Sequence, residues 1–269
     1  MNRLYAIVLS IFLVSMVACN AMPAPRKNVH LTLVGSDSMT WMANAVATAY
    51  MQHYPNVVIS VQSSNSDTGL RATQELSGTI GLVARVVKSS ELIGTRAVVV
   101  ARDGIAVIVN RANPINSMQR SQVTDVFSGK ILTWPLGPGA GKFITVVSRE
   151  QGSGTRDAFE SMAMNGTRVT RTAIVMPSEA AVVDYVSRTP EAIGYVSMGA
   201  LTNQIQAMTI DDIPLSVETV ESQKYPFVRT FSFIVPSPLD PDTQEFIDFV
   251  LSAEGQRIIA QRHGRAPNQ

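Results

Sequence analysis

The chain has 269 residues, of which 45% are hydrophobic and 16% charged, a composition that excludes a disordered or fibrous protein. Lys and Arg total 22 against 21 for Asp and Glu, so the net charge of +1 excludes the basic surface that nucleic-acid binding requires. One cysteine allows neither an intramolecular disulfide nor a cysteine-rich metal cluster, and the three histidines lie far apart in the sequence. We therefore expect no metal site and no cofactor.

The N-terminal segment 1–18 has the pattern of an export signal. A single positive charge at Arg3 is followed by an apolar run that is too short for a comfortable membrane span. The run ends in small residues immediately before Cys19, which resembles the lipobox of bacterial lipoproteins, where the cysteine becomes the acylated N-terminus. Cys19 is therefore the expected lipidation site; the alternative is a plain secretory signal with an incidental cysteine. Residues 19–28 then form the expected tether, with two prolines and no apolar periodicity.

After the tether, strand and helix patterns alternate, which favours an α/β fold with parallel strand pairing. Strands are expected at residues 29–34, 57–61, 79–83, 104–110, 143–147, 192–196 and 227–235. Helices are expected between Trp41 and Pro55, at 70–76, at 121–127, after 152–155, at 178–186 and at 242–262, with a polar loop at 63–69.

These elements divide into two α/β units with two crossings between them. The crossings are expected near residues 101–104 and 225–230, so residues 29–103 with 230–269 form domain I and residues 104–229 form domain II. The C-terminal helix is then expected to pack on the N-terminal domain. A cleft between two such domains is a usual place for a small ligand.

Four turns between strands and helices are rich in small hydroxyl residues. They cover residues 35–39, 63–69, 152–156 and 177–178. Helix N-termini present free N–H groups and a positive dipole end, so such turns can together bind an oxyanion, although each serine can also be a simple N-cap. Arg149 ends a predicted strand four residues before Ser153, where its guanidinium can bind two oxygens of the same anion. The alternative for Arg149 is a surface arginine without a role.

Several stretches in this order resemble the phosphate-binding lipoproteins of bacterial phosphate ABC importers, which are type II periplasmic binding proteins. The resemblance covers residues 29–264 and is carried by residues 35–39, 103–110, 113–115, 126–134, 148–159, 192–196, 225–229 and 252–256. It implies a two-domain α/β fold with the ligand cleft between the domains. It also implies capture of inorganic phosphate, delivery to the membrane permease of an ABC importer, and an extracytoplasmic, lipid-anchored monomer that is not an enzyme.

The resemblance also implies roles for individual residues. The expected phosphate ligands are the Ser38 hydroxyl, the Met39 N–H, Ser66, the Arg149 guanidinium, and Ser153, Gly154 and Thr155 at a helix start. The two domains are expected to close over the anion like a hinged clamp.

Two positions depart from the family pattern and bear on anion selectivity. Ala84 stands where relatives place a hydroxyl or a carboxylate, and a carboxylate there accepts the proton of hydrogen phosphate and excludes sulfate. Asp67 brings a carboxylate into the second turn, where it can replace that proton acceptor or only repel the anion. Arg85 matches a family arginine that is more often structural and is left out of the expected site.

Three other functions stay open at this point. One is binding of another tetrahedral oxyanion, such as tungstate, molybdate or sulfate. A second is a phosphate-sensing relative without transport. The third is a hydrolase with Ser153 or Ser38 as nucleophile, which needs a general base. His30, His53 and His263 do not lie beside the serine turns in the sequence.

Overall fold

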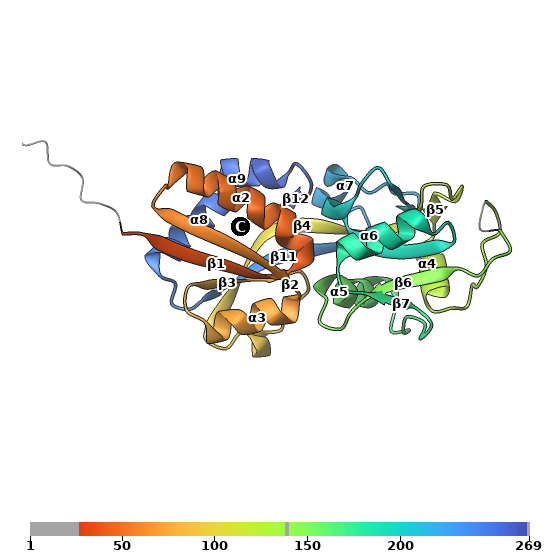
Figure 1. Ribbon diagram of the computed structural model, residues 1–269, viewed down its shortest axis with the longest axis horizontal. Helices are drawn as coiled ribbons and strands as arrows, with labels where there is room; N and C mark the ends of the chain where they lie inside the picture. The colour runs from red at the N-terminus through yellow and green to blue at the C-terminus, as the bar shows by residue number, and fades with distance from the viewer. Residues whose placement is uncertain (1–26, 138–139, 268–269) are drawn as a thin grey trace, which may run out of the picture.

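The computed structural model describes residues 27–137 and 140–267. The predicted signal sequence 1–18, Cys19 and the tether as far as residue 26 lie outside these residues. Figure 1 shows two units side by side, joined by strands that run through the middle of the molecule. No helix in the described part of the chain is long and apolar enough to span a membrane.

A ten-stranded sheet runs through both units in the order β2-β1-β3-β11-β4-β8-β6-β7, and β9 and β12 also pair with β4. Its strands are β1 (Val29–Ser36), β2 (Val57–Ser64), β3 (Thr79–Val83), β4 (Thr95–Asn110), β6 (Thr145–Arg149), β7 (Ile174–Met176), β8 (Ala192–Ser197), β9 (Ile205–Ala207), β11 (Val228–Pro236) and β12 (Gly264–Arg265). Two further strands, β5 (Ser117–Met118) and β10 (Thr209–Ile210), pair with each other.

Eight α-helices in the described residues cover this sheet. They are α2 (Thr40–His53), α3 (Ser66–Glu75), α4 (Arg120–Phe127), α5 (Gly154–Ala163), α6 (Glu179–Arg188), α7 (Val217–Glu221), α8 (Pro241–Leu251) and α9 (Ala253–Ile259). Three short 3-10 helices are η1 (Asp37–Met39), η2 (Ser89–Glu91) and η3 (Met198–Ala200). We call β1 to β3 with α2, α3, α8 and α9 the first unit, and β6 to β8 with α4 to α6 the second unit.

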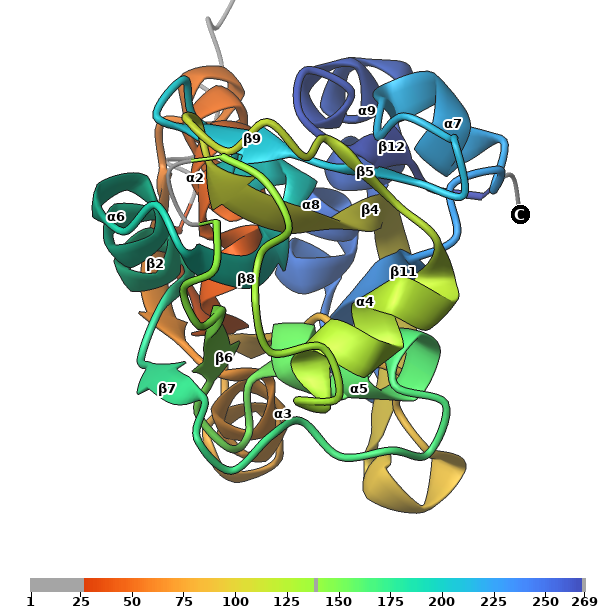
Figure 2. The ribbon, with the colours of Figure 1, turned by 90° about the vertical axis from the view of Figure 1, so that its right-hand side faces the viewer.

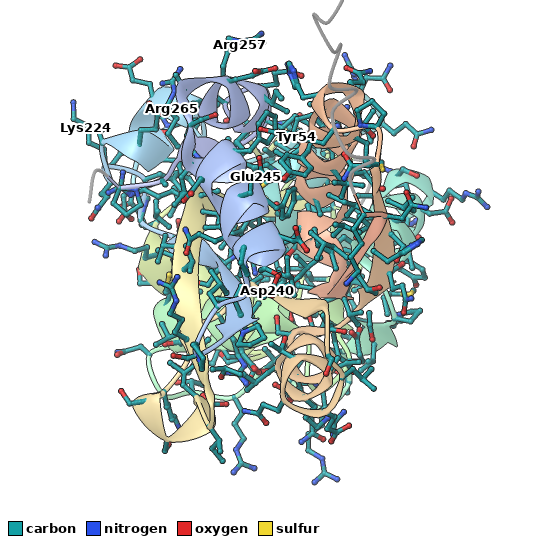
Figure 3. The ribbon with its side chains drawn as sticks, turned by 90° about the vertical axis from the view of Figure 1, so that its left-hand side faces the viewer. Tyr54, Lys224, Asp240, Glu245, Arg257 and Arg265 are labelled. Carbon is teal, nitrogen blue, oxygen red and sulfur yellow. The ribbon has the colours of Figure 1, made fainter. Side chains whose placement is uncertain are left out.

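Each unit has its own buried core. In the first unit, Leu33 and Val46 pack with Phe231 and Phe246, so the C-terminal helices complete the core that the N-terminal strands begin. Figure 3 shows the outer face of this unit, where the Asp240 carboxylate caps α8 by accepting a hydrogen bond of 2.9 Å from the Thr243 N–H.

The second unit has helices on both faces of its sheet. Alternate residues of β4 point to opposite faces, so Ile105 and Val107 join the core under α4 and α5, while Ala106 and Ile108 join the core under α6. Figure 2 shows α6 on one side of β8 and α4 and α5 on the other. This explains the unbroken apolar run in β4, because a strand covered on both faces has no solvent side.

Strand β4 belongs to both units because it changes partner along its length. It pairs antiparallel with β11 from Thr95 to Gly104 and then with β8 from Ile105 to Val109. Pairing is parallel within β2-β1-β3 and within β8-β6-β7, as the alternating sequence pattern predicts. The predicted α/β fold with parallel strand pairing is therefore confirmed, whereas the limits of domains I and II stay a prediction.

The predicted loop at 63–69 is wrong at both ends, because β2 continues to Ser64 and α3 begins at Ser66 and not at Leu70. The Asn65 side chain accepts a hydrogen bond of 2.9 Å from the Thr68 N–H and so caps a helix four residues earlier than the apolar pattern indicates. The second hydroxyl-rich turn is therefore the first turn of a helix.

The predicted single helix 242–262 is also wrong, because it consists of α8 and α9 with a break at Ser252. Ser252 has an extended backbone and its hydroxyl accepts a hydrogen bond of 3.2 Å from the Gly255 N–H, so the residue ends one helix and caps the next. The strand expected at 143–147 lies two residues later, as β6, and leaves Phe143 72% exposed.

Candidate functional site

Four helix starts converge where the two units meet. In the first unit they are the start of η1, which leads directly into α2, and the start of α3. In the second unit they are the starts of α5 and α6. Asp37 in η1 accepts a hydrogen bond of 2.8 Å from the Glu179 N–H at the start of α6, so the two units are in direct contact. Such a cluster gathers free N–H groups and positive dipole ends in one place, which is the arrangement that favours a small anion.

The start of α2 offers its N–H groups without a competing side-chain cap. Ser38 and Met39 are buried, and neither η1 nor α2 has a side chain that caps it. The Ser38 hydroxyl instead shares a hydrogen bond of 2.9 Å with the Ser36 hydroxyl. The N-cap alternative therefore does not describe Ser38, although it does describe Ser153, whose hydroxyl accepts from the Arg156 N–H at 3.3 Å.

The starts of α3 and α5 touch each other across the two units. The Ser66 hydroxyl accepts a hydrogen bond of 3.1 Å from the Ala84 N–H, and both residues are fully buried. A Cβ atom on Gly154 would overlap the Ser66 hydroxyl and would also come within 3.1 Å of the Ala84 carbonyl carbon. The predicted ligands Ser66 and Gly154 therefore lie side by side, and only a glycine permits this approach.

Arg149 is held at the end of β6 with its whole side chain buried. The Tyr195 hydroxyl accepts a hydrogen bond of 3.2 Å from the Arg149 N–H, and the Tyr195 ring stacks on Phe159 with 4.0 Å between ring centroids. Nη2 of Arg149 donates to Asp37 at 3.1 Å and to Glu150 at 3.0 Å. Nη1 has no hydrogen-bond partner among the described residues. This leaves one face of the guanidinium able to bind a ligand.

Glu179, at the start of α6, is a buried carboxyl group of the site. Its Oε1 accepts a hydrogen bond of 2.7 Å from the Thr155 hydroxyl, and its Oε2 accepts one of 3.1 Å from the Ser197 N–H. Burial, together with the nearby charge of Asp37, raises the pKa of Glu179 from 4.5 to about 7, although Arg229 and Arg149 oppose the shift. The Glu179 carboxyl group therefore titrates near neutral pH.

A second buried arginine connects the site to the strands between the units. Arg229, on β11, forms an ion pair of 2.8 Å with Asp103 on β4 and donates hydrogen bonds of 3.0 Å to the Thr155 hydroxyl and to the Ala84 carbonyl. Asp103 also accepts from the Ser197 hydroxyl at 2.7 Å and lies 3.1 Å from Nδ1 of His263. Although burial alone would raise the pKa of Asp103, Arg229 and His263 hold it below its ordinary value.

The structure thus brings the predicted phosphate ligands together, and every one of these ligands is buried. These are Ser38, Met39, Ser66, Arg149, Ser153, Gly154 and Thr155. Their role as ligands stays a prediction.

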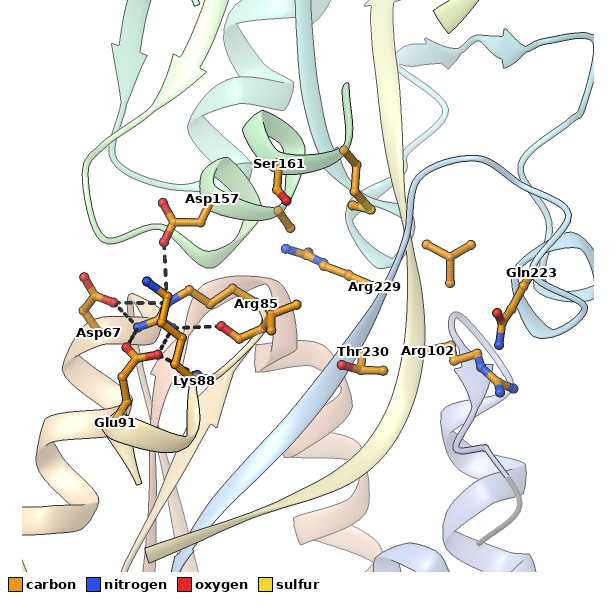
Figure 4. A pocket seen from close by; sticks show the side chains of 14 residues that line it. Asp67, Arg85, Lys88, Glu91, Arg102, Asp157, Ser161, Gln223, Arg229 and Thr230 are labelled. Atoms are coloured by element: carbon orange, nitrogen blue, oxygen red, sulfur yellow. Dashed lines mark hydrogen bonds and ion pairs between the residues drawn. The ribbon is translucent and has the colours of Figure 1, made fainter. Parts of the chain in front are cut away.

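Asp67, the predicted alternative proton acceptor, lies at the edge of this cluster. Its carboxylate pairs with Arg85 at 2.8 Å, and its side chain is 45% exposed. Figure 4 shows both residues, with Glu91 and Asp157, in the wall of a cavity of about 610 Å³ beside the buried cluster. Both Nε and Nη2 of Arg85 donate to Oδ1 of Asp67. A role of Asp67 as a proton acceptor stays a prediction.

Sequence reasoning missed Asp37, Glu179, Asp103 and Arg229 as site residues. Asp37 and Glu179 stand inside or directly after two of the hydroxyl-rich turns, so position along the chain was an available signal for them. Asp103 and Arg229 come together only because β4 and β11 pair, with Arg229 opposite Asp103 in the register.

The contacts of the histidines bear on the hydrolase alternative. His53 lies 3.0 Å from Glu254 and His263 lies 3.1 Å from Asp103. In the part of the chain that the structure describes, neither the Ser38 nor the Ser153 hydroxyl has a hydrogen bond to a histidine. Activation of either serine by a histidine therefore finds no support in these contacts.

Comparison with known proteins places this arrangement in a family. A family model described as a PBP superfamily domain matches residues 22–254. The phosphate-binding protein PstS of Bacillus subtilis is 30% identical over 241 residues, which cover 88% of this chain and 80% of the relative.

Solved structures agree with the sequence match. A Clostridium perfringens structure, described as a phosphate ABC transporter substrate-binding protein with bound phosphate, superimposes with a TM-score of 0.82 at 32% identity and covers 89% of this chain and 100% of its own. An ABC-type phosphate transport receptor from Vibrio cholerae superimposes with a TM-score of 0.72 at 28% identity, covering 88% and 100% of the two chains.

Proposed function

Because this chain belongs to the PBP superfamily and, within it, to the family of the phosphate-binding proteins PstS, we propose that it captures inorganic phosphate between its two units and delivers it to the permease of an ABC importer. The observation that carries the proposal is the set of contacts that joins four helix starts: η1 contacts α6, α6 contacts α5, and α5 contacts α3. The buried Arg149 guanidinium donates to Asp37 in the same cluster. The phosphate bound to the Clostridium perfringens relative supports the choice of ligand.

In this proposal the anion is held by neutral donors and one full positive charge. Ser38, the Met39 N–H and Ser66 bind it from the first unit, and the Arg149 guanidinium with Ser153, Gly154 and Thr155 binds it from the second. A phosphate out of water needs a donor at most of its oxygens, which many N–H and O–H groups supply without a large net charge. Because the donors come from both units, the ligand stabilises the closed arrangement.

Titration calorimetry of the mature chain tests the ligand. Phosphate is expected to bind with one site per chain and a Kd in the micromolar range or tighter, a binding free energy of at least about 8 kcal/mol. Sulfate, molybdate and tungstate form the comparison panel. Heat from tungstate or molybdate without heat from phosphate would replace phosphate by another tetrahedral oxyanion and leave the fold assignment intact.

The proposed location is extracytoplasmic, with the mature chain anchored by lipid at Cys19. The lipobox-like residues before Cys19 support this proposal. Replacing Cys19 with serine in the producing cell is expected to move the protein from the membrane fraction into the soluble extracytoplasmic fraction, with loss of the acyl mass from the N-terminal peptide in mass spectrometry. An unmodified Cys19 in the wild-type protein would indicate a plain secretory signal instead.

A further inference from the structure

Among the described residues, no cation donates a hydrogen bond to the buried carboxylate of Glu179. It is 4% exposed, and its two oxygens accept hydrogen bonds from neutral groups, the Thr155 hydroxyl and the Ser197 N–H. The nearest guanidinium nitrogens, of Arg149 and Arg229, are 3.9 and 4.0 Å from Oε1. A buried carboxylate in such surroundings tends to hold a proton.

This carboxylate faces the atoms that are expected to bind the oxyanion. Oε1 lies beside Nη1 of Arg149, which has no hydrogen-bond partner in the described parts of the chain. Oε1 also lies 2.7 Å from the Thr155 hydroxyl, another expected ligand. An anion that engages both Arg149 and Thr155 therefore meets Oε1 directly.

The charges around Glu179 come from every element packed against it. Asp37 of η1 adds negative charge, while Arg149 of β6 and Arg229 of β11 add positive charge. Behind them, Asp103 of β4 neutralises Arg229 and Glu150 pairs with Arg149, and His263 lies against Asp103. The four carboxylates outnumber the two guanidiniums, so a dianion enters this site more readily if the cluster holds an extra proton.

We propose that Glu179 is the residue that determines anion specificity, by sharing one proton with the bound oxyanion in an O–H···O hydrogen bond. The inference rests on the proposed phosphate-binding function. Hydrogen phosphate brings this proton itself and can donate it to the Glu179 carboxylate, whereas sulfate has no proton to donate at neutral pH. Sulfate therefore binds only when Glu179 is already protonated, whereas ionised Glu179 and hydrogen phosphate share the one proton that the anion itself carries.

Glu179 fills this role better than the other groups near the anion. Ala84 has no polar side-chain atom, and Asp67 is 45% exposed and bound to Arg85 at 2.8 Å. Asp37 already accepts hydrogen bonds from the Arg149 guanidinium and from the Glu179 N–H. Burial raises the pKa of Glu179 to about 7, where proton sharing with phosphate is balanced.

The first test is the affinity of the wild-type mature chain for sulfate between pH 6 and pH 8. Because sulfate requires protonated Glu179, whose pKa is about 7, its Kd is expected to rise about fivefold between pH 7 and pH 8, as the protonated fraction falls from about one half to about one tenth. At pH 8, sulfate binding is also expected to take up close to one proton, measured by calorimetry in buffers of different ionisation enthalpy. A pH-independent sulfate Kd, or no detectable sulfate binding at pH 6, would overturn the inference even if phosphate binds tightly.

The second test is the Glu179→Gln variant, whose amide keeps the shape of the side chain but cannot take the proton. Its sulfate affinity is expected to be independent of pH, and its preference for phosphate over sulfate at pH 8 is expected to fall at least tenfold. Glu160→Gln is the matched control, because Glu160 lies on α5 and pairs with Arg156 at 2.8 Å. That control is expected to keep the wild-type preference.

The outcomes separate this inference from the proposed function. A wild-type chain that binds no phosphate would overturn the proposed function and the inference with it. A wild-type chain that binds phosphate, beside a folded Glu179→Gln variant with unchanged selectivity, would overturn the inference alone. If Glu179→Gln does not fold, the pH series and the proton count on the wild-type chain decide the question.

Discussion

Arg149→Ala is expected to weaken phosphate binding by at least about 3 kcal/mol, which is more than a hundredfold in Kd. Arg149 is the buried cation that faces the expected anion, and its removal leaves Asp37 and Glu150 without their shared partner. Two uncompensated carboxylates then repel the phosphate in surroundings where water screens little. Titration calorimetry with phosphate, beside a thermal unfolding curve to establish that the variant is folded, measures the effect.

The control for this prediction is Arg188→Ala. Arg188 is 77% exposed at the end of α6 and pairs with Asp184 within one helix turn, so its removal is expected to leave phosphate affinity unchanged. Wild-type affinity in a folded Arg149→Ala variant would show that Arg149 does not bind the anion. The assignment of the whole site would then fail, because the other residues were grouped around this guanidinium.

Asp103→Ala is expected to lower the free energy of unfolding by about 3–5 kcal/mol, the usual cost of leaving a buried charge unpaired. Asp103 is fully buried, pairs with Arg229 at 2.8 Å and accepts a hydrogen bond from Ser197 at 2.7 Å. Because these contacts join both long strands to the second unit, the loss is expected to appear in urea unfolding of the whole chain. Asp184→Ala is the control, since Asp184 is 58% exposed and its ion pair is worth less than about 1 kcal/mol.

The contribution of Asp103 to the free energy of unfolding also depends on pH in a defined way. Its pKa in the folded chain lies below the ordinary 3.8, so its stabilisation is present above pH 3.8 and is lost as the pH falls through the lower folded-state value. The part of the difference in unfolding free energy between wild type and Asp103→Ala that comes from the ionisation of Asp103 itself is therefore expected to be constant from pH 5 to pH 8. A difference below about 1 kcal/mol at neutral pH would mean that the Arg229 guanidinium finds another partner or reaches water.

The sequence alone predicts the features that depend on neighbouring residues. Apolar runs and turn residues locate β1, β8 and β11, and the hydroxyl-rich turns fall at helix starts. The prediction failed where one side chain overrides the apolar pattern, as when Asn65 caps α3 early or Ser252 divides the last helix. Capping geometry of this kind follows from backbone angles that a pattern of apolar residues does not contain.

The candidate site likewise has residues that the sequence predicts and residues that it does not. Ser38, Ser66, Ser153 and Thr155 were predicted from motifs, because each motif is contiguous in the chain. Glu179 was not predicted, because its importance comes from contacts with residues 24 and 142 positions away in the sequence, Thr155 and Asp37. Local motifs thus predict where an anion would bind, whereas the charges that are expected to set its protonation come from tertiary contacts.

The break at Ser252 has a consequence for the end of the chain. Because α9 turns back after the break, β12 pairs with Ala101 and Arg102 of β4, next to the point where β4 changes partner. Figure 3 shows Arg265 of this strand on the surface, where it pairs with Glu221 at 3.2 Å. A fluorophore attached beyond β12 would therefore sit beside the strands about which the two units would bend. The C-terminal end is a suitable attachment point for an optical sensor of anion binding, without a label in the cleft itself.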